Sequence, residues 1–477
     1  MIVEPADTKQ ANLLIISDLH LGEDLRPDAE GERERLAEVE RDLVAFLEYY
    51  IWRRLDDRPW RLVINGDMVD FLSICLMPAE VDLILGLHPD DHTYGLGARP
   101  HAAQMKMQKV LDRHHRVFRA LARFVGVGND LSIVVGNHDA ELFWPEVQET
   151  LRDGLVALWP TDPAAQDPTS RSPDEVGAAI TFHPWFFFEE DLVYIEHGHQ
   201  YDGYCSFDTV LYPVTPTGEE IDLNVSTAVV HYVDNHYAAD CPDGYFDYLR
   251  WMLGRGLARG ARIFGSYAMA NLRLIRLWRQ RTPEHIRTIR DKHLERLQKL
   301  ASRYRLPDNV LLELDSLRQR PMALELGKIV RGMMIDRLAL TAAGIGLMVL
   351  FLLFLPWGWV PAAGALAAVT LLWLDRRFRA GRETTSPHQY MRTVSRMIPK
   401  LVRTPIVVFG HAHDPVVERH EDGGWYFNTG AWVVESQEQV RRAFTHLRIR
   451  LTEDGPLPEL RQWRKGRSLD FEPLQAR

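Results

Sequence analysis

The sequence predicts an α/β fold that is interrupted by a large helical insertion. Three observations carry this prediction: short apolar runs alternate with helical patterns, polar motifs follow five of these runs, and a long uncharged stretch lies inside the chain. Alternating strands and helices are typical of layered α/β proteins. With 477 residues the chain is too long for one small core, so we expect more than one structural unit.

The composition indicates a folded protein in a reducing compartment. Hydrophobic residues make up 46% and charged residues 26% of the chain, which excludes a disordered protein. The cysteines Cys75, Cys205 and Cys241 are widely spaced, which argues against a disulfide framework and against a thiolate zinc site. The N-terminal residues lack the basic-then-apolar layout of a secretory signal, so we expect a cytosolic start.

Five apolar runs predict buried strands, and each is followed by a polar motif. The runs are LLIIS, LVIN, LSIVV, LVYIE and PIVVF, and the motifs are Asp18-Leu19-His20, Gly66-Asp67, Gly136-Asn137-His138-Asp139, His197-Gly198-His199 and Gly410-His411-Ala412-His413. Residues 30–55 and 102–125 predict helices, 160–178 predicts a loop, and further strands follow Gly410. Because ligands gather at the carboxyl ends of strands, we expect these motifs to meet.

The motifs combine carboxylate, amide and imidazole ligands. Asp18 and His20 can bind one cation together, and Asp67 has two oxygens that can bridge two cations. The remaining candidate ligands are one amide and three imidazoles, namely Asn137, His197, His411 and His413. Such ligation without thiolate suits Mn, Fe, Zn or Mg. Two cations about 3.5–4 Å apart favour displacement at phosphorus by water. Each motif alone is common, so the prediction rests on all five in order.

In these motifs the chain resembles the calcineurin-like metallophosphoesterase superfamily. The resemblance covers about 1–200 and 400–455, and the NTGAW sequence at 428–432 also fits it. It implies a four-layer α/β/β/α sandwich around two divalent metal ions, of which Mn is the expected one. The DLHLG opening is similar to that of the UDP-2,3-diacylglucosamine hydrolase branch. This chain departs from that branch because it has His138 where the branch has arginine, and because it carries the insertion.

The resemblance also implies a role for each motif residue. One metal would be held by Asp18, His20, Asp67 and His413. The other would be held by Asp67, Asn137, His197 and His411, with Asp67 bridging. His138 would contact the phosphoryl group or protonate the leaving oxygen, and Asp139 would orient it. His199 could exchange roles with His197, and Asp70 is expected to support the site without binding metal. His114 and His115 are expected on an exposed helix.

A membrane-associated insertion is the second prediction. Leu338 to Leu374 contains no charged residue and is divided by a Pro-Trp-Gly-Trp segment, which favours two antiparallel membrane spans. Basic residues flank both ends, namely Arg331, Arg337, Arg376, Arg377, Arg379 and Arg382, so we expect a multi-pass protein with both ends cytoplasmic. A buried helical hairpin of a soluble core is the alternative. The preceding 245–337 holds 20 Lys+Arg against 9 Asp+Glu, which favours anionic lipid; a solvated helix face is its alternative.

These observations predict a membrane-anchored two-metal phosphoesterase. It would hydrolyse a phosphoester or pyrophosphate bond by metal-activated hydroxide, on a membrane-associated or lipid-linked substrate. The alternatives are a nuclease or nucleotide phosphodiesterase with a soluble substrate, and a membrane scaffold with a structural metal site; nucleic acid is not an expected partner. We expect a catalytic domain in two parts, at 1–200 and 401–460. Between them we expect a mostly helical insertion at 201–337, a membrane hairpin at 338–375 and a return linker at 376–400. A tail is expected at 461–477.

Overall fold

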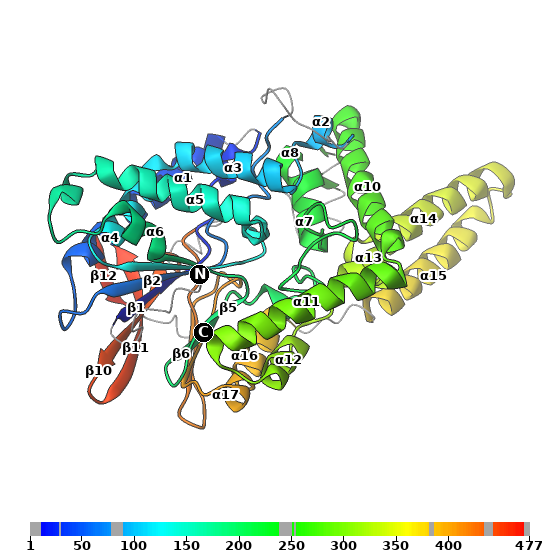
Figure 1. The fold of residues 1–477 in the computed structure, drawn as a ribbon. Coiled ribbons are helices and arrows are strands. Elements are labelled where there is room, and N and C mark those ends of the chain that lie inside the picture. The colour runs from blue at the N-terminus through cyan, green and yellow to red at the C-terminus, as the bar shows by residue number, and fades with distance from the viewer. Residues whose placement is uncertain are drawn as a thin grey trace.

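The protein is an α/β fold with two mixed sheets, and helices account for about half of it (Figure 1). The computed structural model describes residues 11–27, 30–77, 89–237, 250–251, 254–380, 386–433 and 442–471. The expected α/β class is therefore confirmed. All five apolar runs that we expected to be strands are strands.

The larger sheet has seven strands. They are β1 (Asn12–Ile16), β2 (Trp60–Asn65), β3 (Asp130–Val134), β4 (Ile180–His183), β10 (Thr445–Thr452), β11 (Gly455–Arg464) and β12 (Arg467–Asp470). Their order is β12-β11-β10-β1-β2-β3-β4, with parallel pairing from β1 to β4 and antiparallel pairing elsewhere. Residues 461–464 and 467–470, which we expected in a tail, instead form the edge of this sheet.

The smaller sheet has five strands and joins the two parts of the chain on either side of the insertion. They are β5 (Phe186–Glu189), β6 (Val193–Glu196), β7 (Ile406–Phe409), β8 (Val416–Arg419) and β9 (Trp425–Asn428), in the order β5-β6-β7-β9-β8. Strands β6 and β7 pair in parallel, with Tyr194 opposite Val407 and Ile195 opposite Val408. The chain therefore leaves this sheet after β6 and returns to its neighbouring position after about 200 residues.

The two sheets pack face to face. Along β1, Leu13 and Ile15 face the smaller sheet, where they meet Val193 and Val408 in one core cluster. The alternate residues of β1 belong to a second cluster that lies under the helices of the larger sheet. Because both faces of β1 are buried, its residues 13–16 are all apolar and do not alternate with polar residues.

Helices cover the outer face of the larger sheet (Figure 1). They are α1 (Glu30–Trp52), α3 (Pro100–Arg113), α4 (His115–Gly126), α5 (Pro145–Leu158) and α6 (Pro173–Ala178), with the 3-10 turns Glu23–Leu25, Ala140–Phe143, Trp159–Thr161 and Pro163–Gln166. The expected helix at 102–125 is broken at His114, and the expected loop at 160–178 contains short helices. The exposed position expected for His114 is wrong, because its buried ring pairs with Glu40 at 2.7 Å and Asp24 at 3.4 Å.

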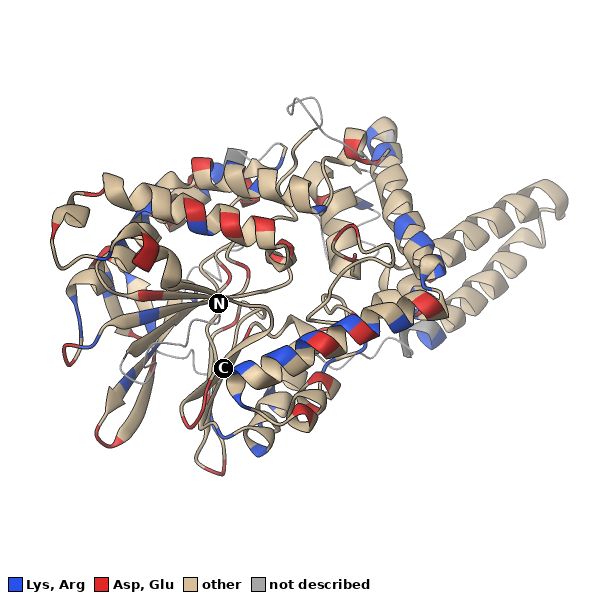
Figure 2. Cartoon of the chain, viewed as in Figure 1, with Lys and Arg blue, Asp and Glu red and all other residues tan. Residues whose placement is uncertain are grey.

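Part of the insertion covers the outer face of the smaller sheet. The helices on this face are α11 (Pro283–Tyr304), α12 (Asp308–Ser316), α16 (Pro387–Ser395) and α17 (Ile398–Leu401). Leu297 and Leu300 of α11 share a core cluster with Phe186 and Tyr194 of the sheet. The basic face of α11 is thus the outer side of a helix that is packed on the same body as the predicted catalytic strands (Figure 2).

The remaining inserted helices form a separate apolar cluster together with α2 (Asp91–Tyr94) from the first part of the chain. The inserted elements are α7 (Val225–Val229), α8 (Asn235–Tyr237), α10 (Leu257–Gln280) and α13 (Leu326–Gly332), with the π-helix Val230–Asp234 and the 3-10 turn Met322–Leu324; the 3-10 turn His199–Tyr201 directly precedes them. Helix α10 carries five arginines and no acidic residue (Figure 2). Its buried Ala270 and Leu274 pack in this cluster with Val225 and Ile329.

The uncharged stretch forms two helices that leave the body together (Figure 1). They are α14 (Ile335–Phe354) and α15 (Val360–Ala380), and they pack on each other. Among the described helices, α14 is the one that is long and apolar enough to cross a membrane, with a mean hydropathy of 2.1 over a window that is 0% buried. This criterion rests on length and composition only. The expected second span and the multi-pass arrangement stay predictions.

Candidate metal centre

The loops after β1, β2, β3, β6 and β7 bring the predicted ligands together. Three of these strands belong to the larger sheet and two to the smaller one, so carboxyl ends of strands from both sheets meet here. Ligand atoms lie within 4.8 Å of one another in three groups, which are Asp18–His20–His413, His20–Asp67–His138 and Asp67–His197–His411. Because His20 and Asp67 each belong to two groups, the three groups form one continuous cluster.

The first side of the cluster contains Asp18, His20 and His413. The Nε2 atom of His413 lies 3.2 Å from Oδ1 of Asp18, and Nε2 of His20 lies 3.9 Å from Oδ2 of Asp67. The backbone N–H of His411 donates to the other oxygen of Asp18 at 3.2 Å, which fixes the carboxylate. The loops after β1 and β7 are thereby joined at the ligand residues themselves.

The second side of the cluster contains Asp67, Asn137, His197 and His411. The Nε2 atom of His197 lies 3.1 Å from Oδ2 of Asp67 and 3.2 Å from Oδ1 of Asn137. Its Nδ1 lies 2.9 Å from the carbonyl oxygen of Asn65, which is the geometry of an Nδ1–H donor. A backbone carbonyl in this position fixes the tautomer and presents Nε2 to a metal. All seven predicted ligands therefore lie in this one cluster.

His199, the alternative to His197, faces a different environment. It is buried, its Nε2 lies 2.8 Å from the side-chain nitrogen of Gln200, and none of the ligand groups of the described chain includes it. Gly198 between the two histidines has φ 104°, so the two side chains do not share a face as residues two apart do along a strand. The geometry favours His197 as the ligand.

Asp70, and not Asp139, contacts the ring of His138. The Nδ1 atom of His138 lies 3.0 Å from Oδ1 of Asp70. Asp139 turns toward the backbone instead and accepts hydrogen bonds from the N–H groups of Gly136 at 2.6 Å and Met68 at 2.8 Å. The orienting role expected for Asp139 is therefore wrong. Asp139 holds the loops after β2 and β3 together, while Asp70 fixes the imidazole.

Five of the predicted ligands have a left-handed backbone. They are Asp18 (φ 56°), His20 (φ 46°), Asp67 (φ 51°), His411 (φ 61°) and His413 (φ 54°). For residues other than glycine this conformation costs roughly 1–2 kcal/mol each. Such residues persist where the surrounding structure holds them, and they concentrate in functional sites. Their clustering here indicates that the loops are shaped to aim these side chains at one point.

Two buried ligand atoms leave room for a cation. The Oδ1 atom of Asp18 and the Nε2 atom of His20 form no hydrogen bond, although His413 Nε2 lies 3.2 Å from the former. Unsatisfied buried polar atoms are uncommon in native proteins, and binding of an ion is one of their ordinary explanations. Carboxylate and imidazole atoms are also the donors that Mn, Fe and Zn accept. The residues present therefore fit a bound metal ion.

The carboxylates and imidazoles of the cluster shift each other's pKa values. Burial would lower the pKa of His138, but the carboxylates of Asp70 and Asp67 raise it to about 10. Burial would likewise lower the pKa of His197, and Asp67 raises it to about 9. For Asp139, burial and the neighbouring charge of Asp67 raise the pKa to about 7. In the protein alone, protons on imidazole nitrogens thus offset the carboxylate charge that a cation would offset.

Asp202 is a contact that the motif analysis missed. Its Oδ2 lies 3.4 Å from Nε2 of His411, and it forms a fourth group of ligand atoms with His411 and Cys205. Burial raises the pKa of the Cys205 thiol well above its usual value, which disfavours the thiolate that a metal needs. The contact of Asp202 with His411 places it where it can orient this imidazole ring. Its position five residues after His197 is the sequence feature from which its place near the cluster could have been predicted.

Comparison of the chain with protein-family models, with curated proteins and with solved structures finds no match. The resemblance to the calcineurin-like metallophosphoesterases therefore stays a prediction that rests on the motifs and on the geometry of the cluster.

Proposed function

We propose that this chain is a metal-dependent phosphoesterase of the calcineurin-like type that holds two divalent cations. The observation that carries the proposal is the meeting of all seven predicted ligands, from five separate strand ends, in one cluster. A chance match of short motifs has no reason to bring residues 18 and 413 within 3.2 Å of each other. Two sheets packed face to face, with helices over both outer faces, also support the proposed four-layer sandwich.

Two divalent cations would supply Lewis acidity, which stabilises negative charge on phosphoryl oxygens and promotes the ionisation of water. The protein side chains would hold these cations and orient the groups that react. Asp67 lies between the two sides of the cluster and fits the bridging role. His138 keeps its Nδ1 on Asp70 and has an 18% exposed side chain, so its Nε2 is the atom that can give a proton to a leaving oxygen.

The first experiment is hydrolysis of a chromogenic phosphodiester and a chromogenic monoester by the detergent-purified chain. We expect turnover that requires added Mn²⁺ and is lost on chelation. Mn²⁺ binding without turnover of either ester would favour the scaffold with a structural metal site. Salt-dependent cleavage of nucleic acid instead of these esters would favour the nuclease.

Asp70→Asn is expected to lower kcat about 10²-fold for an ester with an alkyl leaving group, because His138 then loses its orienting carboxylate. For a p-nitrophenyl ester the loss should be under about tenfold, since p-nitrophenolate needs little protonation. Steady-state kinetics on both esters measures this split. Asp139→Asn is the matched comparison: it should lower thermal stability through the loops after β2 and β3, with equal losses for both leaving groups. Equal losses in Asp70→Asn would remove the proton-transfer role of His138.

We also propose that α14 attaches the protein to a membrane and that the substrate is membrane-associated or lipid-linked. The apolar window of α14 is 0% buried, whereas a core helix of a soluble protein is mostly buried. Leu353 is 69% and Phe354 is 76% exposed. An exposed apolar surface of this kind marks an interaction site. The basic residues at 331 and 337 and at 376–377 favour a cytoplasmic position for the catalytic part.

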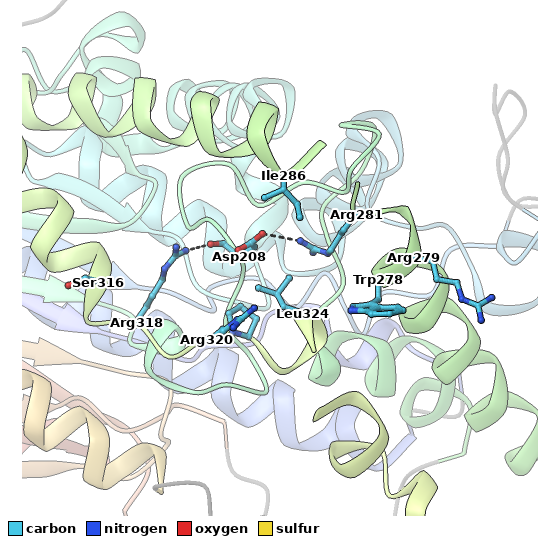
Figure 3. A pocket seen from close by; sticks show the side chains of 10 residues that line it. Asp208, Trp278, Arg279, Arg281, Ile286, Ser316, Arg318, Arg320 and Leu324 are labelled. Atoms are coloured by element: carbon cyan, nitrogen blue, oxygen red, sulfur yellow. Dashed lines mark hydrogen bonds and ion pairs between the residues drawn. The ribbon is translucent and has the colours of Figure 1, made fainter. Parts of the chain in front are cut away.

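A basic cavity of about 640 Å³ lies where α10 ends and α11 begins (Figure 3). Its wall combines the apolar Trp278, Ile286 and Leu324 with four arginines, which are Arg279, Arg281, Arg318 and Arg320. Asp208 lies between two of these arginines and holds them in place (Figure 3). Leu324 is two residues before α13, which leads into α14. A mixed basic and apolar wall close in sequence to α13 supports anionic lipid as the proposed partner.

Replacing 338–374 by a short Gly-Ser linker is expected to release the protein from vesicles. The Nε atom of Arg337 lies 3.5 Å from Oδ1 of Asp375 at the base of the two helices. A short linker can therefore join residues 337 and 375. Sedimentation with phosphatidylglycerol vesicles should fall at least about tenfold, because about 20 apolar residues set membrane affinity. Hydrolysis of a soluble chromogenic ester should stay within about twofold, since no predicted ligand is removed.

Trp52→Ser is the control for the linker variant, because Trp52 is 73% exposed but lies on α1, away from α14. It should sediment like the unmodified chain. Undiminished sedimentation of the linker variant would contradict attachment through α14.

A further inference from the structure

A small crevice lies between the metal-motif loops and the inserted helices. Its cavity measures about 50 Å³, and its wall includes Lys106 of α3, Glu141 and Leu72 on one side and Tyr232 and Arg273 on the other. The backbone N–H of Phe71 donates to the carbonyl oxygen of His138 at 3.0 Å, and Leu72 is the next residue along the chain. The crevice therefore begins two residues after Asp70.

The inserted region is tied to this wall by direct contacts. Asn235 of α8 donates from its side-chain nitrogen to the carbonyl oxygen of Leu72 at 2.7 Å. The hydroxyl of Tyr232 donates to Asp90 at 3.1 Å. Arg273 of α10 pairs with Glu220. These three polar groups of the insertion are thus engaged with fixed partners at or beside the crevice.

Lys106 and Glu141 are different, because both are buried without an ion pair. Each side chain belongs to a residue that is only 2% exposed. The ammonium group of Lys106 donates to the carbonyl oxygen of Phe71 at 3.2 Å, and within the described chain it has no carboxylate within 4.0 Å. The Oε2 atom of Glu141 has no hydrogen-bond partner.

Burying one cation and one anion without a direct pair is costly, and native proteins rarely retain such an arrangement without a use. Both groups line the same crevice, and each lies close enough to act on the charge of the other. What they lack is a molecule between them that accepts from the ammonium and donates to the carboxylate.

We propose that this crevice binds a hydroxyl-bearing part of the substrate, namely a diol or polyol on the alcohol that is esterified to the phosphate. A hydroxyl is both acceptor and donor, so one oxygen can accept from Lys106 while its hydrogen is donated to Glu141. Arg273 and Glu220 of the wall pair with each other, and Lys106 and Glu141 add one positive and one negative group that suit a neutral hydroxyl. About 50 Å³ suits a group of few atoms. The proposal rests on the proposed phosphoesterase function, and it makes the insertion part of substrate recognition.

The test compares two esters with the same leaving group, glyceryl p-nitrophenyl phosphate and propyl p-nitrophenyl phosphate. The unmodified protein with Mn²⁺ should have at least about a tenfold lower KM for the glyceryl ester. In the double variant Lys106→Met/Glu141→Leu this KM ratio should fall to about one. An unmodified ratio near one, or a ratio that survives in the double variant, would overturn the proposal.

The double variant also protects the test from a folding artefact. Removing one of two buried charges leaves the other uncompensated, whereas replacing both by apolar groups is often neutral or stabilising. We therefore expect the melting temperature of the double variant to be unchanged or higher. The matched controls are Lys109→Met and Glu149→Gln, whose side chains are exposed on α3 and α5. Both should keep the KM ratio of the unmodified protein.

A binding measurement separates this proposal from the proposed function. Calorimetric titration of glycerol 1-phosphate and propyl phosphate into the Mn²⁺-loaded chain should show the same preference for the glycerol ester, and the double variant should lose it. If no ester is hydrolysed but this preference and its loss are seen, the phosphoesterase fails and the crevice stands. Aminopropyl phosphate is the third compound in this titration. If it binds more tightly than glycerol 1-phosphate, the crevice takes an ammonium group, which overturns the proposal. Equal binding of all three compounds would also overturn it and leave the crevice as a water site only.

Discussion

Asp67→Asn is expected to abolish Mn²⁺-dependent hydrolysis, with a loss in kcat of at least about 10³-fold. Asp67 is 1% exposed and belongs to the ligand groups on both sides of the cluster. Its Oδ2 faces His197 at 3.1 Å and His20 at 3.9 Å, while its Oδ1 accepts from the backbone N–H of His138 at 2.8 Å. A metal ion contributes several kcal/mol of charge stabilisation, which corresponds to this loss. Asparagine keeps the size but not the charge.

The measurement combines kcat with the number of Mn ions per chain. We expect Asp67→Asn to lose at least one ion. Asp24→Asn is the matched control, because Asp24 is also buried but pairs with Arg113 and His114 outside the cluster. It should lower thermal stability and leave the Mn content unchanged. A variant at Asp67 that keeps both ions and its turnover would remove the two-metal assignment.

The strands that carry the site could be predicted because their signal is local. A run such as LLIIS is buried on both faces, so the apolar residues follow one another without interruption, and the polar motif marks where the strand ends. The order of the strands is not local. That β6 and β7 pair across about 200 residues, and that β10 to β12 extend the edge beside β1, depends on contacts that no short window contains.

The ligands could be predicted for the same reason, whereas the supporting residues could not. Ligand types at strand ends are a property of the sequence. Which way a side chain points in an irregular loop depends on the backbone, and here several ligands adopt left-handed φ. Asp139 is adjacent to His138 in sequence yet faces Gly136 and Met68, while Asp70 reaches the ring across 68 positions. The prediction from adjacency in sequence therefore gave His138 the wrong carboxylate partner.

The packing of the inserted helices could not be predicted from the sequence either. Their basic, amphipathic pattern indicated that each has an apolar face, but not what that face packs against. Leu297 and Leu300 of α11 lie against the smaller sheet, so the period of three to four residues in this helix reports packing on the predicted catalytic body. Lys106 and Glu141 gave no sequence signal, since charged residues on helices and in loops are ordinarily exposed. Only the fold reveals that both are buried in one crevice.

Gly136→Ala is expected to damage stability and metal binding together. A Cβ at this position would lie 2.2 Å from Oδ1 and 2.7 Å from the backbone nitrogen of Asp67, so either Asp67 or the loop after β3 must move. Overpacking of this kind costs about 1–3 kcal/mol, and the displaced atoms are those of the proposed bridging ligand. Chemical denaturation should show the loss of stability, and the Mn content and kcat should fall with it.

Gly265→Ala separates the effect of position from the effect of the added methyl group. Gly265 lies in α10 with nothing within 4 Å of an added Cβ, so alanine there should stabilise the protein by up to about 1 kcal/mol through helix propensity. Hydrolysis and Mn content should not change. The same chemical substitution is thus expected to have opposite signs at two sites. If Gly136→Ala behaved like Gly265→Ala, the close approach of the loops after β2 and β3 would be wrong, and with it the placement of Asp67 between the two sides of the cluster.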